Sequence, residues 1–142
     1  MSRKLEILKR LIGCWQAGDI EGALGFMTDD IVWHYAAAVA PPVRGKEKAR
    51  KFLTGFKARI SEVDWRIFDW AERGERLFVE GVDQFLSAEG GRVAAPYAGV
   101  LEFRGELICA WRDYVDMGVM SAQQLGEPRS AWVAALIERP AL

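Results

Sequence analysis

The sequence lacks the features that mark several large classes of protein. Nowhere do about eighteen apolar residues run together, so no stretch predicts a membrane-spanning helix. Nineteen Lys and Arg stand against twenty Asp and Glu, and a formal net charge of −1 gives no field that would attract a nucleic acid backbone. The short basic run from Arg44 to Lys51 is typical of a solvated helix face. Nucleic acid and membrane are therefore not expected partners.

Cysteine and histidine are also scarce. Cys14 and Cys109 have no CxxC spacing and no neighbouring metal-ligand pattern, which favours free thiols over a zinc site. The only histidine, His34, has no second ligand or triad partner in the sequence pattern. The N-terminal stretch MSRKLEILKRLIGCW is interrupted by charge, unlike a signal peptide. We therefore predict no metal, no organic cofactor and a cytoplasmic location.

Apolar and aromatic residues, in contrast, are abundant. Hydrophobic residues make up 51% of the 142 residues, with six Trp and seven Phe, which predicts a core or pocket rich in aromatic rings. This length is typical of one domain. We expect a single domain over residues 1–142, with a core over about 3–120 and a C-terminal helical tail over about 121–142.

The first sixty residues carry helical signals around one strand. A helix is predicted over residues 3–17 by an apolar stripe at spacings of three and four, made of Leu5, Leu8, Ile12 and Trp15. Asp19 is a candidate cap for a short second helix that runs to Met27. Residues 29–35 predict a strand, and a proline-containing loop without regular pairing follows. The run over residues 45–60 predicts a third helix.

The period of the pattern then changes to two. Turn signals at Arg73-Gly74, Glu89-Gly90-Gly91 and Arg104-Gly105 separate four strand-like runs, which predicts an antiparallel meander. A last helix is predicted from Ser130 to Glu138. Helices followed by a long-stranded meander indicate an α+β fold in which one sheet curls around packed helices. Such an arrangement leaves a pocket at one end, where small ligands bind.

Two acids interrupt the apolar faces of the predicted strands. Asp113 falls on the face of one strand with Leu107, Cys109, Trp111, Val115 and Met117, and Asp83 falls on that of another with Leu77, Val79, Gly81 and Phe85. A carboxylate removed from water without partners costs several kcal/mol and tends to hold a proton. We expect the two acids to meet and to share a proton or a water, one as acid and one as base. The structural alternative is that they lie at a sheet margin, solvated or paired with Arg92 or Arg112.

The chain also resembles a known family. The order of the elements, the loop PPVRGKEKARKFL and the stretch LEFRGELICAWRDYVD are similar to limonene-1,2-epoxide hydrolase, over roughly residues 5–120. That family belongs to the nuclear-transport-factor-2-like superfamily, and related forms of WRDY occur in its ketosteroid isomerase-like and polyketide cyclase-like (SnoaL-like) branches. The resemblance implies a cone-shaped domain with a curved mixed, mainly antiparallel sheet.

The same resemblance implies roles for individual residues. Asp113 would be the base that activates a water, Asp83 the acid that protonates the epoxide oxygen, and Tyr35 a contact to the water. The family's bridging arginine is replaced by Gly81 and its asparagine by Ala37. Without the arginine, the acid pair should bind one proton more firmly, and Gly81 should leave extra volume beside it.

Strand parity and proximity complete a predicted pocket, made of Trp33, Ala37, Gly81, Phe85, Ala95, Tyr97, Val115, Met117 and Met120. Three functions remain open for a small hydrophobic ligand: cofactor-independent epoxide hydrolysis, an isomerase or cyclase reaction, and binding without catalysis. A homodimer is a further possibility, through an outward sheet face made of Phe78, Val82, Leu86, Val100, Ile108 and Tyr114.

Overall fold

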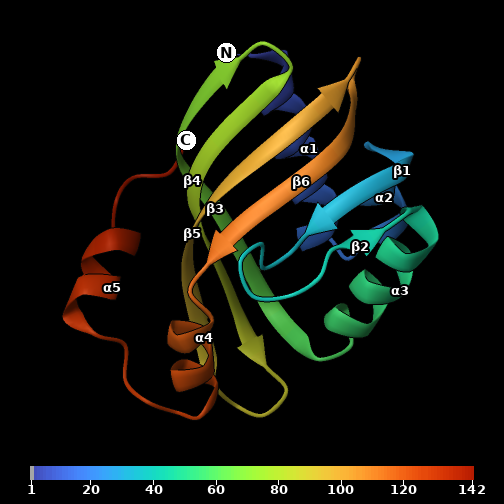
Figure 1. Cartoon of the computed structure of the whole chain (residues 1–142). Helices are drawn as coiled ribbons and strands as arrows, with labels where there is room; N and C mark the ends of the chain where they lie inside the picture. The colour runs from blue at the N-terminus through green and yellow to red at the C-terminus, as the bar shows by residue number, and fades with distance from the viewer. Residues whose placement is uncertain (1) are drawn as a thin grey trace.

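One curved six-stranded sheet organises the molecule, whose computed structural model describes residues 2–142. The strands are β1 (Met27–His34), β2 (Val43–Arg44), β3 (Ile60–Arg73), β4 (Arg76–Ser87), β5 (Arg92–Arg104) and β6 (Leu107–Val115). They lie in the order β2-β1-β6-β5-β4-β3, and every neighbouring pair is antiparallel except β1 and β6 (Figure 1). The α+β class and the mixed, mainly antiparallel sheet predicted from the sequence are confirmed.

The helices pack on both sides and at one end of this sheet. They are α1 (Arg3–Gln16), α2 (Ile20–Leu24), α3 (Lys46–Lys57), α4 (Met117–Gln124) and α5 (Ala131–Ile137). The predicted caps are present: the Asp19 side chain accepts from the backbone N–H of Gly22, and the Ser130 hydroxyl accepts from that of Val133. Helix α1 lies behind the sheet in Figure 1, whereas α5 lies on the opposite side.

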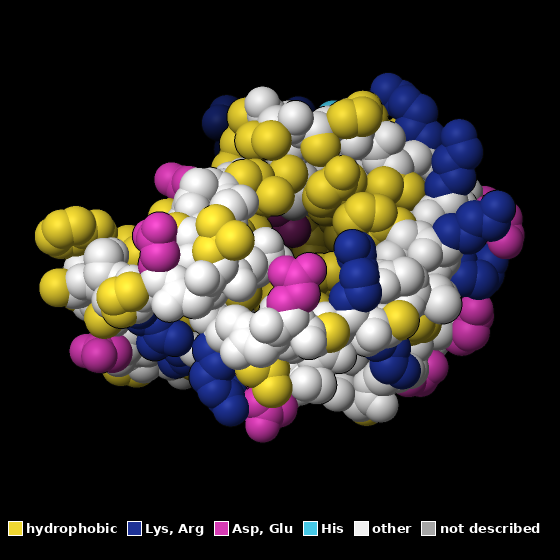
Figure 2. All heavy atoms as spheres, turned by 90° about the horizontal axis from the view of Figure 1, so that it is seen from below, with side chains coloured by type: hydrophobic (Ala, Val, Ile, Leu, Met, Phe, Trp, Pro, Cys, Tyr) yellow, Lys and Arg dark blue, Asp and Glu magenta, His cyan; other side chains and the backbone are white. Residues whose placement is uncertain are grey.

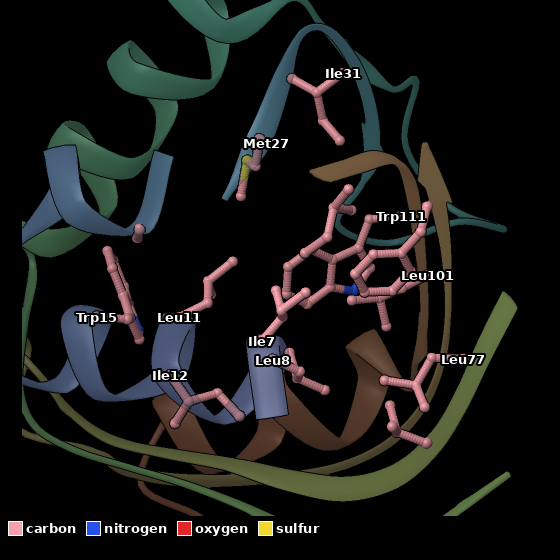
Figure 3. Packing of buried hydrophobic residues seen from close by; sticks show 14 of the residues in the cluster. Ile7, Leu8, Leu11, Ile12, Trp15, Met27, Ile31, Leu77, Leu101 and Trp111 are labelled. Carbon is pink, nitrogen blue, oxygen red and sulfur yellow. The ribbon is translucent and has the colours of Figure 1, made fainter. Parts of the chain in front are cut away.

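The main core lies between α1 and the concave face of the sheet. Figure 3 shows Ile7, Leu8, Leu11, Ile12 and Trp15 of α1 together with Met27, Ile31, Leu77, Leu101 and Trp111 from the strands. Full burial of one such side chain contributes about 1.5–3 kcal/mol. Leu11, Trp15, Met27 and Trp111 also border the cavity described below, so the cavity begins where this packing ends.

A β-bulge in β6 corrects the predicted alternation of that strand. Glu102 of β5 pairs with Ala110, but the next residue, Phe103, pairs with Ile108, so β6 contains one extra residue. Ile108 therefore points into the core and is fully buried, while Leu107 is 40% exposed. The prediction that Leu107 and Cys109 share the inner face with Trp111, and that Ile108 faces outward, is wrong.

Several element bounds also differ from the predictions. Helix α2 ends at Leu24 rather than continuing to Met27, which already begins β1. The two residues of β2 do pair, with Val32 and Trp33, directly after the prolines. Helix α4 was not predicted; it begins because the Asp116 side chain accepts hydrogen bonds from the first-turn amides of Gly118 and Val119.

The outer face of the sheet is partly covered by the chain's own C-terminus. Helix α5 buries Val133 and Ile137 against Phe68, Val82 and Ala94. Two arginines reinforce the contact: Arg139 pairs with Glu80 at 2.7 Å, and Arg66 donates to the carbonyl of Ile137 at 2.9 Å. Val82 is therefore not free to contact a second copy, whereas Phe78 and Tyr114 remain 37% and 51% exposed.

Candidate functional site

A cavity of about 340 Å³ opens at the end of the cone near α3 and α4. Figure 2 views the molecule from this end and shows a hollow ringed by hydrophobic side chains, with an acidic side chain in its depth. Pockets of this size and polarity bind small molecules. The question for function is therefore which polar groups reach into this apolar space.

The structure brings most of the predicted site residues to the wall of the cavity. These are Trp33, Tyr35, Asp83, Ala95, Tyr97, Asp113, Val115, Met117 and Met120. Three others lie elsewhere. Phe85 packs edge-on against Phe56 in a buried cluster, the backbone N–H of Ala37 donates to the carbonyl of Asp113 at 2.9 Å, and Gly81 lies against the ring of Tyr97.

Asp113 projects inward from β6, opposite Gly99 of β5. Its Oδ1 accepts a hydrogen bond from Nε1 of Trp111 at 2.8 Å. A side chain at position 99 would meet this oxygen, because a Cβ there would lie 2.7 Å from it. Burial raises the pKa of Asp113 to about 8; the Trp111 hydrogen bond acts in the opposite direction, and the Asp83 carboxylate adds to the rise.

Asp83 projects inward from β4, opposite Ala95 of β5 and Trp65 of β3. Burial raises its pKa to about 7, and within residues 2–142 its carboxyl accepts no side-chain or backbone hydrogen bond. Both acids touch the cavity, so water or a ligand reaches them only through an apolar enclosure.

Neither acid has the arginine partner that the structural alternative required. Arg92 pairs with Glu62 at 2.9 Å, and Arg112 pairs with Glu102 at 2.7 Å. No salt bridge to Asp83 or Asp113 occurs in the part of the chain that the structure describes. The prediction of two acids in an apolar setting therefore agrees with their placement, and pairing with these arginines is wrong.

The register separates the two acids more than the sequence suggested. Strand β5 lies between β4 and β6, with Asp83 opposite Ala95 and Asp113 opposite Gly99. Two strand spacings and four residues of rise would place their backbones roughly 15 Å apart in a flat sheet. The acid-bearing strands therefore do not adjoin, and Tyr97, midway between Ala95 and Gly99, occupies the position between the acids.

Tyr97 is the third polar group of the cavity. Its hydroxyl oxygen accepts a hydrogen bond from Nε1 of Trp65 at 2.6 Å, and its side chain is only 7% exposed. Burial raises the pKa of Tyr97 well above its usual value, and the neighbouring Asp113 and Asp83 act in the same direction. The phenol therefore stays protonated and remains a hydrogen-bond donor.

Helix α3 supplies a wall of the cavity that was not among the predicted site residues. Phe52 lies with its ring centroid 4.4 Å from that of Tyr35 and 5.2 Å from that of Trp33, and Phe56 and Arg59 also reach the cavity. The apolar stripe of this helix was the available signal for Phe52 and Phe56. Arg59 falls outside that stripe, and nothing in the sequence pattern marked it.

No group of three or more His, Cys, Asp or Glu side chains within residues 2–142 could hold a metal ion. Cys14 and Cys109 are free and half-buried. No helix in the same range has both the length and the apolar character needed to cross a membrane.

Solved structures with the same architecture come from several bacteria. An epoxide hydrolase of M. tuberculosis, of the limonene epoxide hydrolase-like type, is 21% identical, with a TM-score of 0.74 over 87% of this chain and 90% of that one. A putative SnoaL-like polyketide cyclase from Shewanella putrefaciens is 17% identical, with a TM-score of 0.77 over 88% and 98%. A protein with a ketosteroid isomerase-like fold from Catenulispora acidiphila, solved with trimethylamine, is 23% identical, with a TM-score of 0.76 over 87% and 94%.

These likenesses establish the fold, and the sequence establishes the family. Among curated proteins, no relative matches the chain. The model of the SnoaL-like domain matches residues 8–111, which include most of the sheet and the first three helices. The chain therefore belongs to the SnoaL-like domain family and has the nuclear-transport-factor-2-like fold.

Proposed function

We propose that the chain binds a small, mainly apolar molecule in this cavity and acts on it by proton transfer, using Asp83 and Asp113 without a cofactor. One observation carries the proposal: two carboxyls without a cationic partner line an apolar cavity, and burial brings their pKa values to about 7 and about 8. Acids that titrate near the working pH are suited to general acid–base catalysis.

The two carboxyls can divide the roles of acid and base between them. Their pKa values of about 7 and about 8 are close, so the form with a proton on Asp83 and a charge on Asp113 is similar in free energy to the reverse arrangement. The pKa of about 8 already includes the Trp111 hydrogen bond, so the form with a charged Asp113 is the less populated one; we take it as the reactive form because the match to the WRDY motif puts the base at Asp113. We assign Asp113 as the base and Asp83 as the acid.

Hydrolysis of an epoxide is the reaction that this assignment supports best. Asp113 takes a proton from a water, whose oxygen attacks a ring carbon of the epoxide. The carbon–oxygen bond breaks, and the leaving oxygen receives the proton of Asp83. Tyr35, which lines the same cavity, is positioned to contact the water or the substrate. The starting protonation state returns when Asp113 loses that proton and Asp83 regains one, through water in the cavity or after the diol has left.

The test is diol formation from a panel of terpene, styrene and steroid epoxides. We expect Asp113→Asn and Asp83→Asn each to lower turnover by about a hundredfold or more, because general acid–base groups contribute on that scale. Carrying out the reaction in ¹⁸O-water should place one labelled oxygen in the diol. Turnover that is unaffected by Asp113→Asn would count decisively against the proposal.

Enolisation is the second candidate, and a specific observation favours it. The Tyr97 hydroxyl lies between the two acids and accepts from Trp65, so its own hydrogen is available to a developing enolate oxygen. One carboxyl would abstract a proton next to a carbonyl. Exchange of deuterium into an enone in heavy water, followed by NMR, would separate this reaction from hydration. If neither reaction occurs while ligands still bind, the cavity is a binding site without catalysis.

A further inference from the structure

We infer that the Tyr97 hydroxyl donates a hydrogen bond to a neutral oxygen atom of the ligand, so the cavity selects apolar molecules that carry one ketone, ether or epoxide oxygen. The inference deepens the proposed function, because it rests on the same cavity binding a small apolar molecule. It assigns to Tyr97 a role in ligand selection and names the chemical class of the group that it recognises.

The position of the Tyr97 ring follows from small residues around it. Across β4 its partner is Gly81, and the preceding and following inward positions of β5 are Ala95 and Gly99. The ring edges lie 3.2 Å and 3.4 Å from where a Cβ of Gly81 and of Gly99 would stand. The ring therefore fills the space that Gly81 leaves, and the expectation of empty volume at that position is wrong.

The direction of the hydroxyl follows from Trp65. Its indole N–H donates to the Tyr97 oxygen at 2.6 Å, and the two rings meet edge to face, with centroids 6.3 Å apart and an interplanar angle of 64°. A hydroxyl that accepts from one side keeps its own hydrogen for another partner. Within residues 2–142 no protein group accepts that hydrogen, so it is left for water or a ligand in the cavity.

The surroundings determine which ligand group fits. A carboxylate on the ligand would face Asp83 and Asp113, and the only cationic side chain in the cavity wall is Arg59 within the residues that the structure describes. An ammonium brings only donors to a phenol that needs an acceptor, and at pH 6 it meets Asp83 and Asp113 mainly in their protonated, uncharged form. A neutral oxygen supplies an acceptor without charge, and the aromatic walls accommodate the rest of the molecule.

The test compares three probes with one ring skeleton: 1-tetralone, tetralin and 1-aminotetralin. With ten or eleven non-hydrogen atoms, all three are small enough for a cavity of about 340 Å³. Titration at pH 6, monitored by tryptophan fluorescence, gives the three dissociation constants. We expect the ketone to bind about tenfold more tightly than the hydrocarbon, which is the size of one good hydrogen bond, and the ammonium to bind most weakly.

Variants test whether Tyr97 causes the preference. Tyr97→Phe should reduce the ratio between ketone and hydrocarbon to about twofold or less while leaving the affinity for tetralin unchanged. Trp65→Phe keeps the hydroxyl but removes its orientation, so an intermediate ratio is expected. Tyr114→Phe is the matched control, since this tyrosine is 51% exposed on the outer face, and it should retain the full preference.

Two outcomes would overturn the inference: a preference for the ketone that survives in Tyr97→Phe, or wild-type protein that binds the amine as tightly as the ketone. If Tyr97→Phe does not fold, the ratio in Trp65→Phe decides, because an unchanged ratio there excludes an oriented phenol. None of the probes is an epoxide. A ketone preference without epoxide turnover would support this inference and refute the proposed hydrolysis. Epoxide turnover without a ketone preference would refute this inference and support the proposed hydrolysis.

Discussion

Replacing Asp113 with Asn should make the protein more stable at pH 8 and nearly as stable as the wild type at pH 5. The reason is that folding buries a carboxyl whose pKa rises from an ordinary 3.8 to about 8. Between these values the folded protein binds more protons than the unfolded chain, so stability falls as the pH rises. The penalty is absent below about pH 4 and complete above about pH 8. Asparagine has the same shape and does not titrate.

The magnitude follows from the two pKa values. Each pH unit within the window costs about 1.4 kcal/mol for each titrating group, so Asp113 removes about 4 kcal/mol between pH 5 and pH 8. Asp83, with a pKa of about 7, removes about 2 kcal/mol between pH 5 and pH 7. Carboxyls in surface ion pairs, such as Glu102, have lowered pKa values and titrate below this window.

Urea unfolding at pH 5, 6, 7 and 8 gives the free energy of unfolding of wild type and variant. The difference between them cancels the titrating groups that do not interact with Asp113, and should grow by several kcal/mol across the series. Asp83→Asn should show the same trend with its midpoint about one pH unit lower. A difference that stays constant between pH 5 and pH 8 would show that the Asp113 carboxyl is ionised in the folded protein at acidic pH.

Two further predictions concern packing. In thermal denaturation, Gly81→Ala should lower the free energy of unfolding by about 1–3 kcal/mol, because the new Cβ would lie 2.4 Å from the carbonyl oxygen of Arg66. Gly55→Ala is the control: it lies in the exposed part of α3 with nothing within 4 Å, and it should raise the free energy of unfolding by up to about 1 kcal/mol. Ile137→Ala should lower the free energy of unfolding by about 2–4 kcal/mol and, by loosening α5, increase the binding of a hydrophobic dye to the outer face. If neither stability nor dye binding changes, α5 is not part of the cooperative fold.

Much of the fold was predictable because its signals are local. The stripe containing Leu8 and the caps Asp19 and Ser130 each identified a helix within a few residues, and the glycine turns divided the meander correctly. Helix α4 was missed because Val115 and Met117 continue the alternation of β6. The end of the strand depends on the Asp116 side chain capping the next turn, which the periodicity does not reveal.

The parts of the site that were not predicted depend on register. Alternation showed that Asp83 and Asp113 face inward, and the predicted meander implied that β5 lies between β4 and β6, but neither gave the register that sets Asp83 opposite Ala95 and Asp113 opposite Gly99. The bulge that turns Ile108 inward also has no signature in the pattern, since an extra residue in one strand is defined only against its partner. Tyr97 was assigned to the pocket wall by parity, whereas its position between the acids follows from pairing with Gly81.

The energetics of the two acids connect the fold to the proposed function. At neutral pH each buried carboxyl costs the fold several kcal/mol, a large share of the 5–15 kcal/mol that stabilises a typical domain. A neighbouring arginine would remove much of that cost by holding both groups ionised, but the space that it would need is filled by the Tyr97 ring over Gly81. The phenol donates a hydrogen bond without adding charge, so the acids keep their protons to near neutral pH. The same two acids that destabilise the fold thereby provide the cavity with carboxyls that can exchange protons near neutral pH.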